Sequence, residues 1–137
     1  MRFMLPVVLL TLAALGTSAR AADSKPTGIF SDLTYNTEGG DLSGVEVLIL
    51  PGIGSGFRAF VQIAEGGAPF AALVPVTITG DSVEFWVRDY AAIPGLRFSG
   101  ILDAGGITGR WYDGSKQIDS FGGSSVERLK RGKSYWQ

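Results

Sequence analysis

Histidine and cysteine, the side chains most often used as nucleophiles, general bases and zinc ligands, are both absent from this chain of 137 residues. Neither a Ser–His–Asp or Cys–His arrangement nor a zinc site with those ligands can therefore form. Carboxylates remain, and two of them could act as acid and base if a sheet brought them together. The candidates are Asp32, Asp103, Asp113 and Asp119, which lie in or near polar stretches and turns. Aspartate is favoured in such stretches for local hydrogen bonding, so we expect no enzyme, metal or cofactor.

A glycine-rich loop offers a second kind of chemistry, the binding of a nucleotide. Gly52, Gly54 and Gly56 form a G-x-G-x-G pattern directly after an apolar stretch. Phosphate binding by such a loop needs a helix after it, because the helix N-terminus faces the phosphates. The next segment, Phe57 to Ile63, alternates like a strand instead. The sequence therefore predicts a hairpin loop here and no nucleotide site.

The start of the chain has the pattern of a secretory signal peptide. Met1-Arg2 gives a positive end, Phe3 to Leu15 is an apolar run, and Ala19-Arg20-Ala21 fits a small-residue cleavage site. The apolar run is shorter than the roughly 20 residues that a membrane span needs. We expect residues 1–21 to be removed, residues 22–137 to form one domain, and the protein to be periplasmic or secreted without a membrane span.

Composition narrows the fold and the partners. Removal of Arg2 and Arg20 leaves 10 of the 12 basic residues against 13 acidic ones, a net charge of −3. Such a mild charge gives no indication of a nucleic acid or an anionic membrane as a partner. The chain is 45% hydrophobic and contains 20 glycines, which argues against disorder and favours strands joined by tight turns.

The stretch Leu96 to Tyr112 organises the predicted fold as two strands folded on each other. Each strand carries a glycine two residues from a large aromatic ring, Phe98 with Gly100 and Gly109 with Trp111. Glycine inside a strand marks a bend or a close backbone approach. Paired glycines beside paired rings predict a strongly coiled hairpin in which the rings cover the gaps.

Alternation of apolar residues predicts the other strands. They span residues 28–36, 43–50, 57–65, 73–79, 82–88 and 124–131. In the first strand Ile29, Leu33 and Tyr35 share one face and Phe30 lies on the other. Pro75 has no backbone N–H, so it marks an edge or a bulge in its strand. Residues 115–123 fit no element.

The turns between these strands are short. Gly80-Asp81 joins two alternating runs, and glycine in its first position favours a type II′ hairpin. No helix or long crossover is expected, so the fold class is all-β, an antiparallel up-and-down meander of about eight strands. Such a meander forms a closed or nearly closed small barrel, or a strongly coiled open sheet. Closure removes exposed edges, which favours the barrel.

The aromatic side chains supply the candidate binding residues. In a filled barrel most of them form the core, and in a partly hollow barrel they line a pocket for a small apolar ligand. The candidate ligand-binding residues are Phe57, Val61, Phe85, Phe98 and Trp111. Phe60 and Trp86 stand opposite the apolar faces of their strands and are candidates for a partner surface. Tyr135 and Trp136, beside basic residues, either dock on the barrel or extend that surface.

Gly28-Ile29-Phe30 near the start of the first strand, with Arg128 on the last, resembles the signature of lipocalin and avidin-like barrels. Those families place Gly-x-Trp on the first strand and pack a late basic residue across that ring. The F-x-G…G-x-W hairpin is also similar to strands of such barrels. Here Phe30 replaces the tryptophan, and the mature chain is shorter than a typical lipocalin. The chain also resembles uncharacterised secreted bacterial proteins that end in a similar R-G-K-S-Y-W stretch, which carries no function.

Two functions follow as expectations. The first is a non-enzymatic periplasmic or secreted barrel that binds a small apolar ligand. The alternative is a protein-interaction module, such as a protease inhibitor or an envelope partner, that uses the aromatic and basic C-terminal tail.

Overall fold

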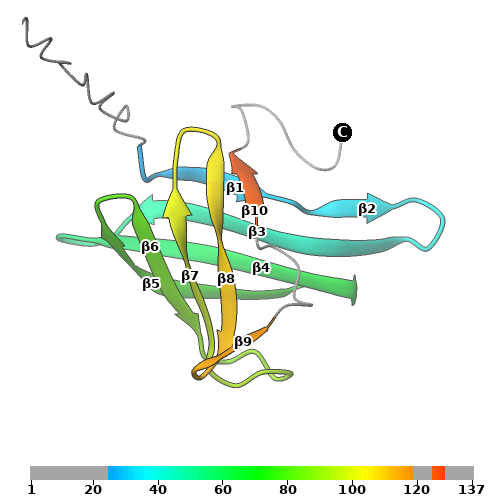
Figure 1. Ribbon diagram of the computed structural model, residues 1–137. Helices are drawn as coiled ribbons and strands as arrows, with labels where there is room; N and C mark the ends of the chain where they lie inside the picture. Colours follow the sequence, from blue (N-terminus) through cyan, green and yellow to red (C-terminus); the bar gives the residue numbers. More distant parts are fainter. Residues whose placement is uncertain (1–24, 119–124, 129–137) are drawn as a thin grey trace, which may run out of the picture.

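The computed structural model describes residues 25–118 and 125–128. The expected signal peptide over residues 1–21 and the tail residues Tyr135 and Trp136 lie outside this part of the chain. The described residues form ten strands and no helix (Figure 1). The strands are β1 (Gly28–Ser31), β2 (Thr34–Asn36), β3 (Asp41–Pro51), β4 (Phe57–Gly67), β5 (Phe70–Thr79), β6 (Ser82–Val87), β7 (Leu96–Leu102), β8 (Gly106–Asp113), β9 (Lys116–Ile118) and β10 (Ser125–Arg128).

Eight of these strands close into an antiparallel barrel. The ring runs β1, β3, β4, β5, β6, β7, β8, β10, and β10 pairs again with β1. β2 pairs with β3 and β9 with β8, outside the ring. The predicted all-β meander and its closure into a barrel are therefore confirmed.

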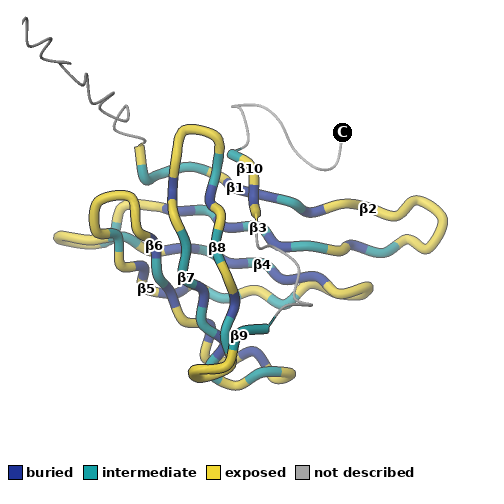
Figure 2. Tube along the Cα trace, viewed as in Figure 1, coloured by how far each residue is buried: buried dark blue, intermediate teal, exposed yellow. Residues whose placement is uncertain are grey.

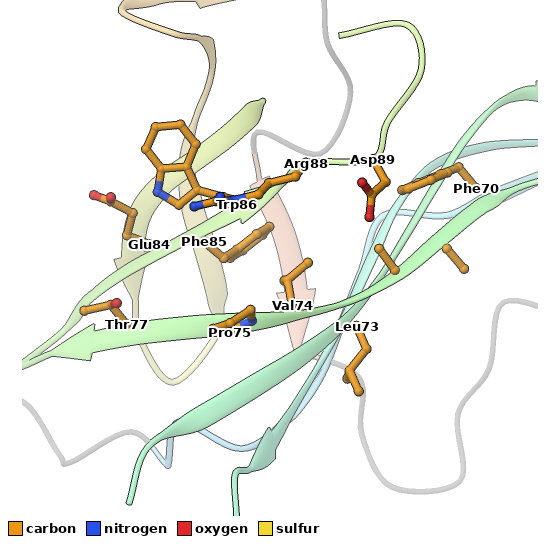
Figure 3. Close-up of a pocket in the computed structure, with 12 residues that line it drawn as sticks. Phe70, Leu73, Val74, Pro75, Thr77, Glu84, Phe85, Trp86, Arg88 and Asp89 are labelled. Atoms are coloured by element: carbon orange, nitrogen blue, oxygen red, sulfur yellow. The ribbon is translucent and has the colours of Figure 1, made fainter. Parts of the chain in front are cut away.

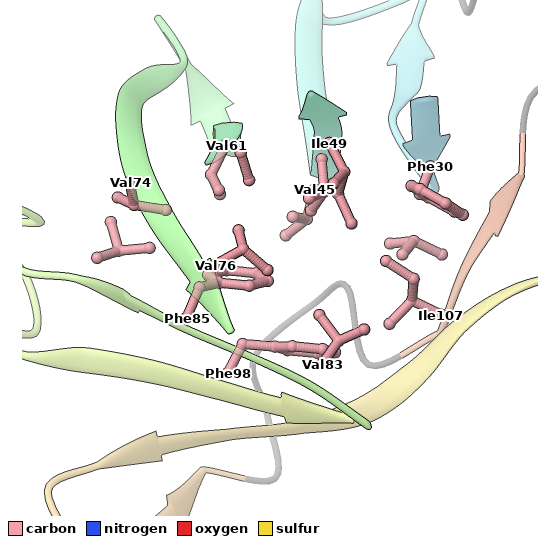
Figure 4. Packing of buried hydrophobic residues seen from close by; sticks show 14 of the residues in the cluster. Phe30, Val45, Ile49, Val61, Val74, Val76, Val83, Phe85, Phe98 and Ile107 are labelled. Carbon is pink, nitrogen blue, oxygen red and sulfur yellow. The ribbon is translucent and has the colours of Figure 1, made fainter. Parts of the chain in front are cut away.

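Buried and exposed residues alternate along the longer strands of the ring (Figure 2), and the buried apolar side chains fill its inside. In β4, for example, Ala59, Val61 and Ile63 are buried while Arg58 is exposed. Side chains from both halves of the barrel point toward one another across the interior (Figure 4). Their burial is the main favourable contribution to folding, since the chain has no disulfide.

Several predicted boundaries change, among them the start of β3 at Asp41 rather than at residue 43 and the end of β4 at Gly67 rather than at residue 65. β5 begins at Phe70 rather than at residue 73, and residues 115–123, which had no assignment, contain β9. The last strand is described over Ser125–Arg128, where Val126 is buried. The turn at Gly80 is as predicted, because its φ of 59° is positive while that of Asp81 is not, as a type II′ turn requires.

The first strand differs from its expected form. Instead of one continuous strand, the chain makes β1 and β2, and the expected shared face of Ile29, Leu33 and Tyr35 is wrong. Ile29 is 37% exposed and Tyr35 is exposed, whereas Leu33 is buried in a small cluster separate from the barrel core. The residue that enters the barrel core from β1 is Phe30.

The break between β1 and β2 has a local cause at Asp32. Its backbone N–H donates to the carbonyl of Val45, but the N–H of Val45 donates to the Asp32 carboxylate at 2.6 Å. The side chain thus replaces the backbone carbonyl in the ladder. Opposite it, Gly44 has a φ of 113°, and a Cβ there would lie 2.7 Å from the Asp32 carbonyl oxygen.

The β7–β8 hairpin confirms the predicted relation between glycines and rings. Gly100 and Gly109 are direct cross-strand partners, and so are Phe98 and Trp111. A Cβ on either glycine would collide with the Phe98 ring and with the facing backbone. The two backbones therefore approach closely under the ring, as glycine inside a strand permits.

Ring closure is reinforced by one side chain on the last strand. The Arg128 guanidinium lies 4.5 Å from the ring centre of the buried Phe30. It also donates hydrogen bonds to the carbonyls of Thr27 at 3.0 Å and Lys25 at 2.7 Å. A Cβ at Gly28 would lie 2.8 Å from its Nη1 atom, so this glycine makes room for the arginine. β10 thereby holds the chain on both sides of the start of β1.

We expect Gly109→Ala to lower the free energy of unfolding by about 2 to 3 kcal/mol, because the added methyl group overlaps the Phe98 ring and the Ser99 carbonyl. Urea unfolding followed by circular dichroism measures the change. Gly67→Ala is the matched control, since a Cβ there meets nothing within 4 Å, and it should change stability by less than about 0.5 kcal/mol. Equal effects of the two substitutions would contradict the close-approach account.

Arg128→Ala should lower the free energy of unfolding by about 1 to 3 kcal/mol, because it removes the cation over Phe30 and leaves two carbonyls without their donor. Arg110→Ala is the control, because Arg110 is exposed and donates a hydrogen bond to the side chain of Gln117. Thermal unfolding of both variants compares them. A smaller loss for Arg128→Ala than for Arg110→Ala would refute this role in closure.

Candidate functional site

The barrel wall opens between β5 and β6. These strands pair from Thr79 and Ser82 next to the turn as far as Val76 and Phe85, and no further. Beyond that point β5 continues to pair with β4, and β6 continues to pair with β7. A cleft of about 480 Å³ lies where the two strands diverge (Figure 3).

Pro75 explains why the pairing stops at this position. In a two-residue hairpin the residues next to the turn exchange hydrogen bonds, and every second residue then repeats this on the same edge. Counted from Thr79, the backbones of Thr77 and Pro75 face β6. Pro75 has no N–H to donate, so the next hydrogen-bonded pair, with Trp86, cannot form completely. The sequence prediction of an edge at Pro75 is thereby confirmed.

The cleft connects the outer surface with the barrel core. Val74 and Phe85 point into the space between the strands from the core side. Leu73 and Trp86, which are 56% and 41% exposed, line it from the outer side. The polar groups are at its ends. They belong to Thr77, Glu84, Arg88 and Asp89. An apolar middle with few polar groups is typical of a small-molecule site.

Neighbouring side chains hold Trp86 in place. The Arg97 guanidinium on β7 lies 5.5 Å from the Trp86 ring centre and 4.4 Å from that of Tyr112 on β8. Glu84 forms a 3.5 Å ion pair with the same guanidinium. A partly exposed pair at this distance contributes little stability alone, but the stacked row fixes the orientation of the indole at the rim of the cleft.

The far end of the cleft is held by Tyr90, which follows the lining residue Asp89. The buried Tyr90 hydroxyl donates a 2.5 Å hydrogen bond to the Glu65 carboxylate at the end of β4. The ring of Phe70 packs edge-on against that of Tyr90 at 5.2 Å. Burial, and then the Glu65 carboxylate, raise the pKa of Tyr90 to about 12. The connection after β6 is thus tied to β4 and β5.

The structure separates the predicted ligand-binding residues. Phe85, Phe98 and Trp111 pack in the core with ring centres 5.0 to 5.8 Å apart. Val61 is buried in the same core, and Phe57 is half-buried against it. Phe85 is the member of this set that reaches the cleft.

The predicted partner residues and one residue that sequence reasoning missed lie on the outer surface. Trp86 lines the cleft next to Phe85, and Phe60 is half-buried beside its cross-strand partners Leu48 and Leu73. Leu73 was missed because it lies in the exposed phase of a strand whose pattern indicates only the inward residues. The signal that could have identified Leu73 is its position two residues before Pro75, because alternation places both residues on the same side of β5.

Two of the aspartates considered for catalysis, Asp103 and Asp32, accept hydrogen bonds from backbone N–H groups. Asp103 accepts hydrogen bonds from the N–H groups of Gly105 and Gly106 at 2.7 and 2.9 Å, within the β7–β8 turn. Asp32 accepts the N–H of Val45. Asp119 lies outside the described residues. Within residues 25–118 and 125–128, no group of three or more acidic residues could hold a metal ion.

Comparison with known proteins adds no relative. The chain matches no protein-family model, no curated protein and no solved structure. In the part of the chain that the structure describes, no helix could cross a membrane.

The raised pKa of Tyr90 predicts a pH dependence. The unfolded hydroxyl titrates near pH 10 and the folded one near pH 12, so its contribution to stability is complete below pH 10 and is lost between pH 10 and 12. Urea unfolding at a series of pH values should show Tyr90→Phe less stable than the wild type at pH 9, with the difference shrinking toward pH 12. Tyr112→Phe is the control. A Tyr90→Phe difference that stays constant over this range would contradict the prediction.

Proposed function

We propose that this barrel is a non-enzymatic binding protein that takes a small apolar ligand in the cleft between β5 and β6. The observation that carries the proposal is the opening itself, about 480 Å³ with an apolar middle that reaches from Trp86 to the core residue Phe85. Cavities of this size bind drug-sized molecules in other proteins. The packed aromatic rings in the core favour the cleft over the barrel interior as the site.

The signal-peptide pattern of residues 1–21 supports a periplasmic or secreted location for this binding protein. The stacking of Arg128 on Phe30 is the arrangement that the resemblance to lipocalin and avidin-like barrels implies. It supports the same proposal, because those barrels are binding proteins.

A second candidate, the protein-interaction module, is favoured by one feature of the outer surface. Ile29, Leu48, Phe60 and Leu73 stand in direct cross-strand register over β1, β3, β4 and β5. Ile29 and Leu73 are exposed, so a partner could cover an apolar row that ends at the cleft. Tyr135 and Trp136, which the sequence places on such a surface as an expectation, lie outside the described part of the chain.

The ligand proposal is tested by native mass spectrometry of protein purified from its host, together with a titration of a fluorescent fatty-acid probe. We expect probe binding, and Leu73→Asp should weaken it at least about tenfold because a charge replaces an apolar wall of the cleft. Ile101→Asp is the matched control, since Ile101 is equally exposed at 56% but lies on β7 away from the cleft. No copurified mass and no probe response, or equal losses in both variants, would overturn the proposal.

A further inference from the structure

The rim of the cleft is made of backbone as well as apolar side chains. On β5 the same alternation that turns Pro75 toward β6 turns the N–H and C=O groups of Leu73 and Ala71 in that direction. Among the described residues, Phe70–Pro75 pairs with β4 alone, so this edge of β5 has no strand beside it. Trp86 faces the same gap from β6.

An open strand edge is normally protected. Natural proteins place lysines, prolines or bulges along such an edge, because its N–H and C=O groups pair readily with another chain. Here the sequence from Phe70 to Pro75 is F-A-A-L-V-P, which has no charge, and the proline comes only at its end. The edge therefore keeps its hydrogen-bonding groups available beside an apolar cleft.

A hydrocarbon ligand would fill this cleft but would leave the edge groups without partners, which costs free energy in an apolar site. A second extended backbone matches them, since its own N–H and C=O groups repeat with the same two-residue period. We propose that the ligand of the cleft is an extended apolar peptide segment of a partner protein, which adds to the edge of β5 as a strand. This inference rests on the proposed function.

The geometry of the gap favours a single segment over a second copy of the barrel. Trp86 and Arg88 stand opposite the β5 edge and line the other side of the same cleft. The remaining space, about 480 Å³, admits one chain and not a folded domain. The free edge would pair with about six residues, or about 20 Å of extended chain.

Side-chain preferences follow from the two faces of the cleft. Alternate residues of the peptide would point toward Val74 and Phe85 in the core and should be apolar. The others would lie between Leu73 and Trp86 at the surface. A charged residue in the middle of the bound peptide would find no ion-pair partner in the apolar part of the cleft lining.

The test compares two substitutions at one position, Leu73→Pro and Leu73→Ala. Both remove the leucine side chain, but only the proline variant also removes the N–H that faces the cleft, and that N–H is not used in pairing with β4. The probes are a dye-labelled hexapeptide of alternating valine and threonine and the fluorescent fatty acid. We expect Leu73→Pro to bind the hexapeptide at least about tenfold more weakly than Leu73→Ala, and both to bind the fatty acid equally.

Two further measurements isolate strand addition. The hexapeptide with N-methyl groups at alternate residues keeps its side chains but loses donors, so its binding should fall at least about tenfold. Pro75→Thr supplies an N–H opposite Trp86, so it should close the cleft and weaken the binding of both probes. Thr77→Val is the control, because Thr77 already lies within the β5–β6 ladder, and it should leave the binding of both probes unchanged. Circular dichroism confirms that each variant is folded.

The outcomes separate this inference from the proposed function. Binding of the fatty acid without binding of the hexapeptide, or equal binding of the methylated and unmethylated peptides, overturns strand addition and leaves the proposed function standing. Failure of both probes on the wild-type protein overturns both. Slower amide exchange at Leu73 and Ala71 in the presence of the hexapeptide is the expected direct sign, and unchanged exchange there would contradict strand addition.

Discussion

The hydrogen-bonded ladder around the ring is the constraint on which the remaining structure depends. A small chain without disulfides must bury its apolar residues in one core, and the sheet encloses that core by pairing the last strand of the ring with the first. Among the described residues, the seam between β1 and β10 has two residue pairs, and Arg128 supports it through Phe30 and two backbone carbonyls. Where the ladder is interrupted, at Pro75, a cleft opens that is lined by the core residues Val74 and Phe85.

Two residue types, glycine and proline, decide the shape of the barrel wall through their effects on the backbone. Glycine brings strands together, since Gly100 and Gly109 allow the two backbones of one hairpin to meet under the Phe98 ring. Proline keeps strands apart, since Pro75 withholds the donor that would continue the β5–β6 ladder. The close approach of two strands and the opening between two others therefore arise on neighbouring hairpins from opposite backbone effects.

Much of the fold could be predicted from the sequence because strand alternation is a local property. The inward residues of β4, β5 and β6, the Gly80 turn and the glycine–aromatic hairpin all depend on residues close together in the chain. The break at Asp32 could not be predicted, since it depends on a carboxylate that reaches Val45 on another strand. The residues of the cleft were predicted as members of different surfaces for the same reason. Phe85 and Trp86 were assigned to separate surfaces, and only the divergence of two strands brings them to one cleft.

The turn at Gly80-Asp81 holds one end of β5 and β6 together, and the Tyr90–Glu65 bond ties the far end of the opening to β4. Between these points the two strands are paired next to the turn and separated beyond Val76 and Phe85. Antiparallel hydrogen bonds break in pairs, so the slot cannot lengthen gradually. It can extend toward the turn only in steps of two residues, and the first step would release Thr77 from Glu84.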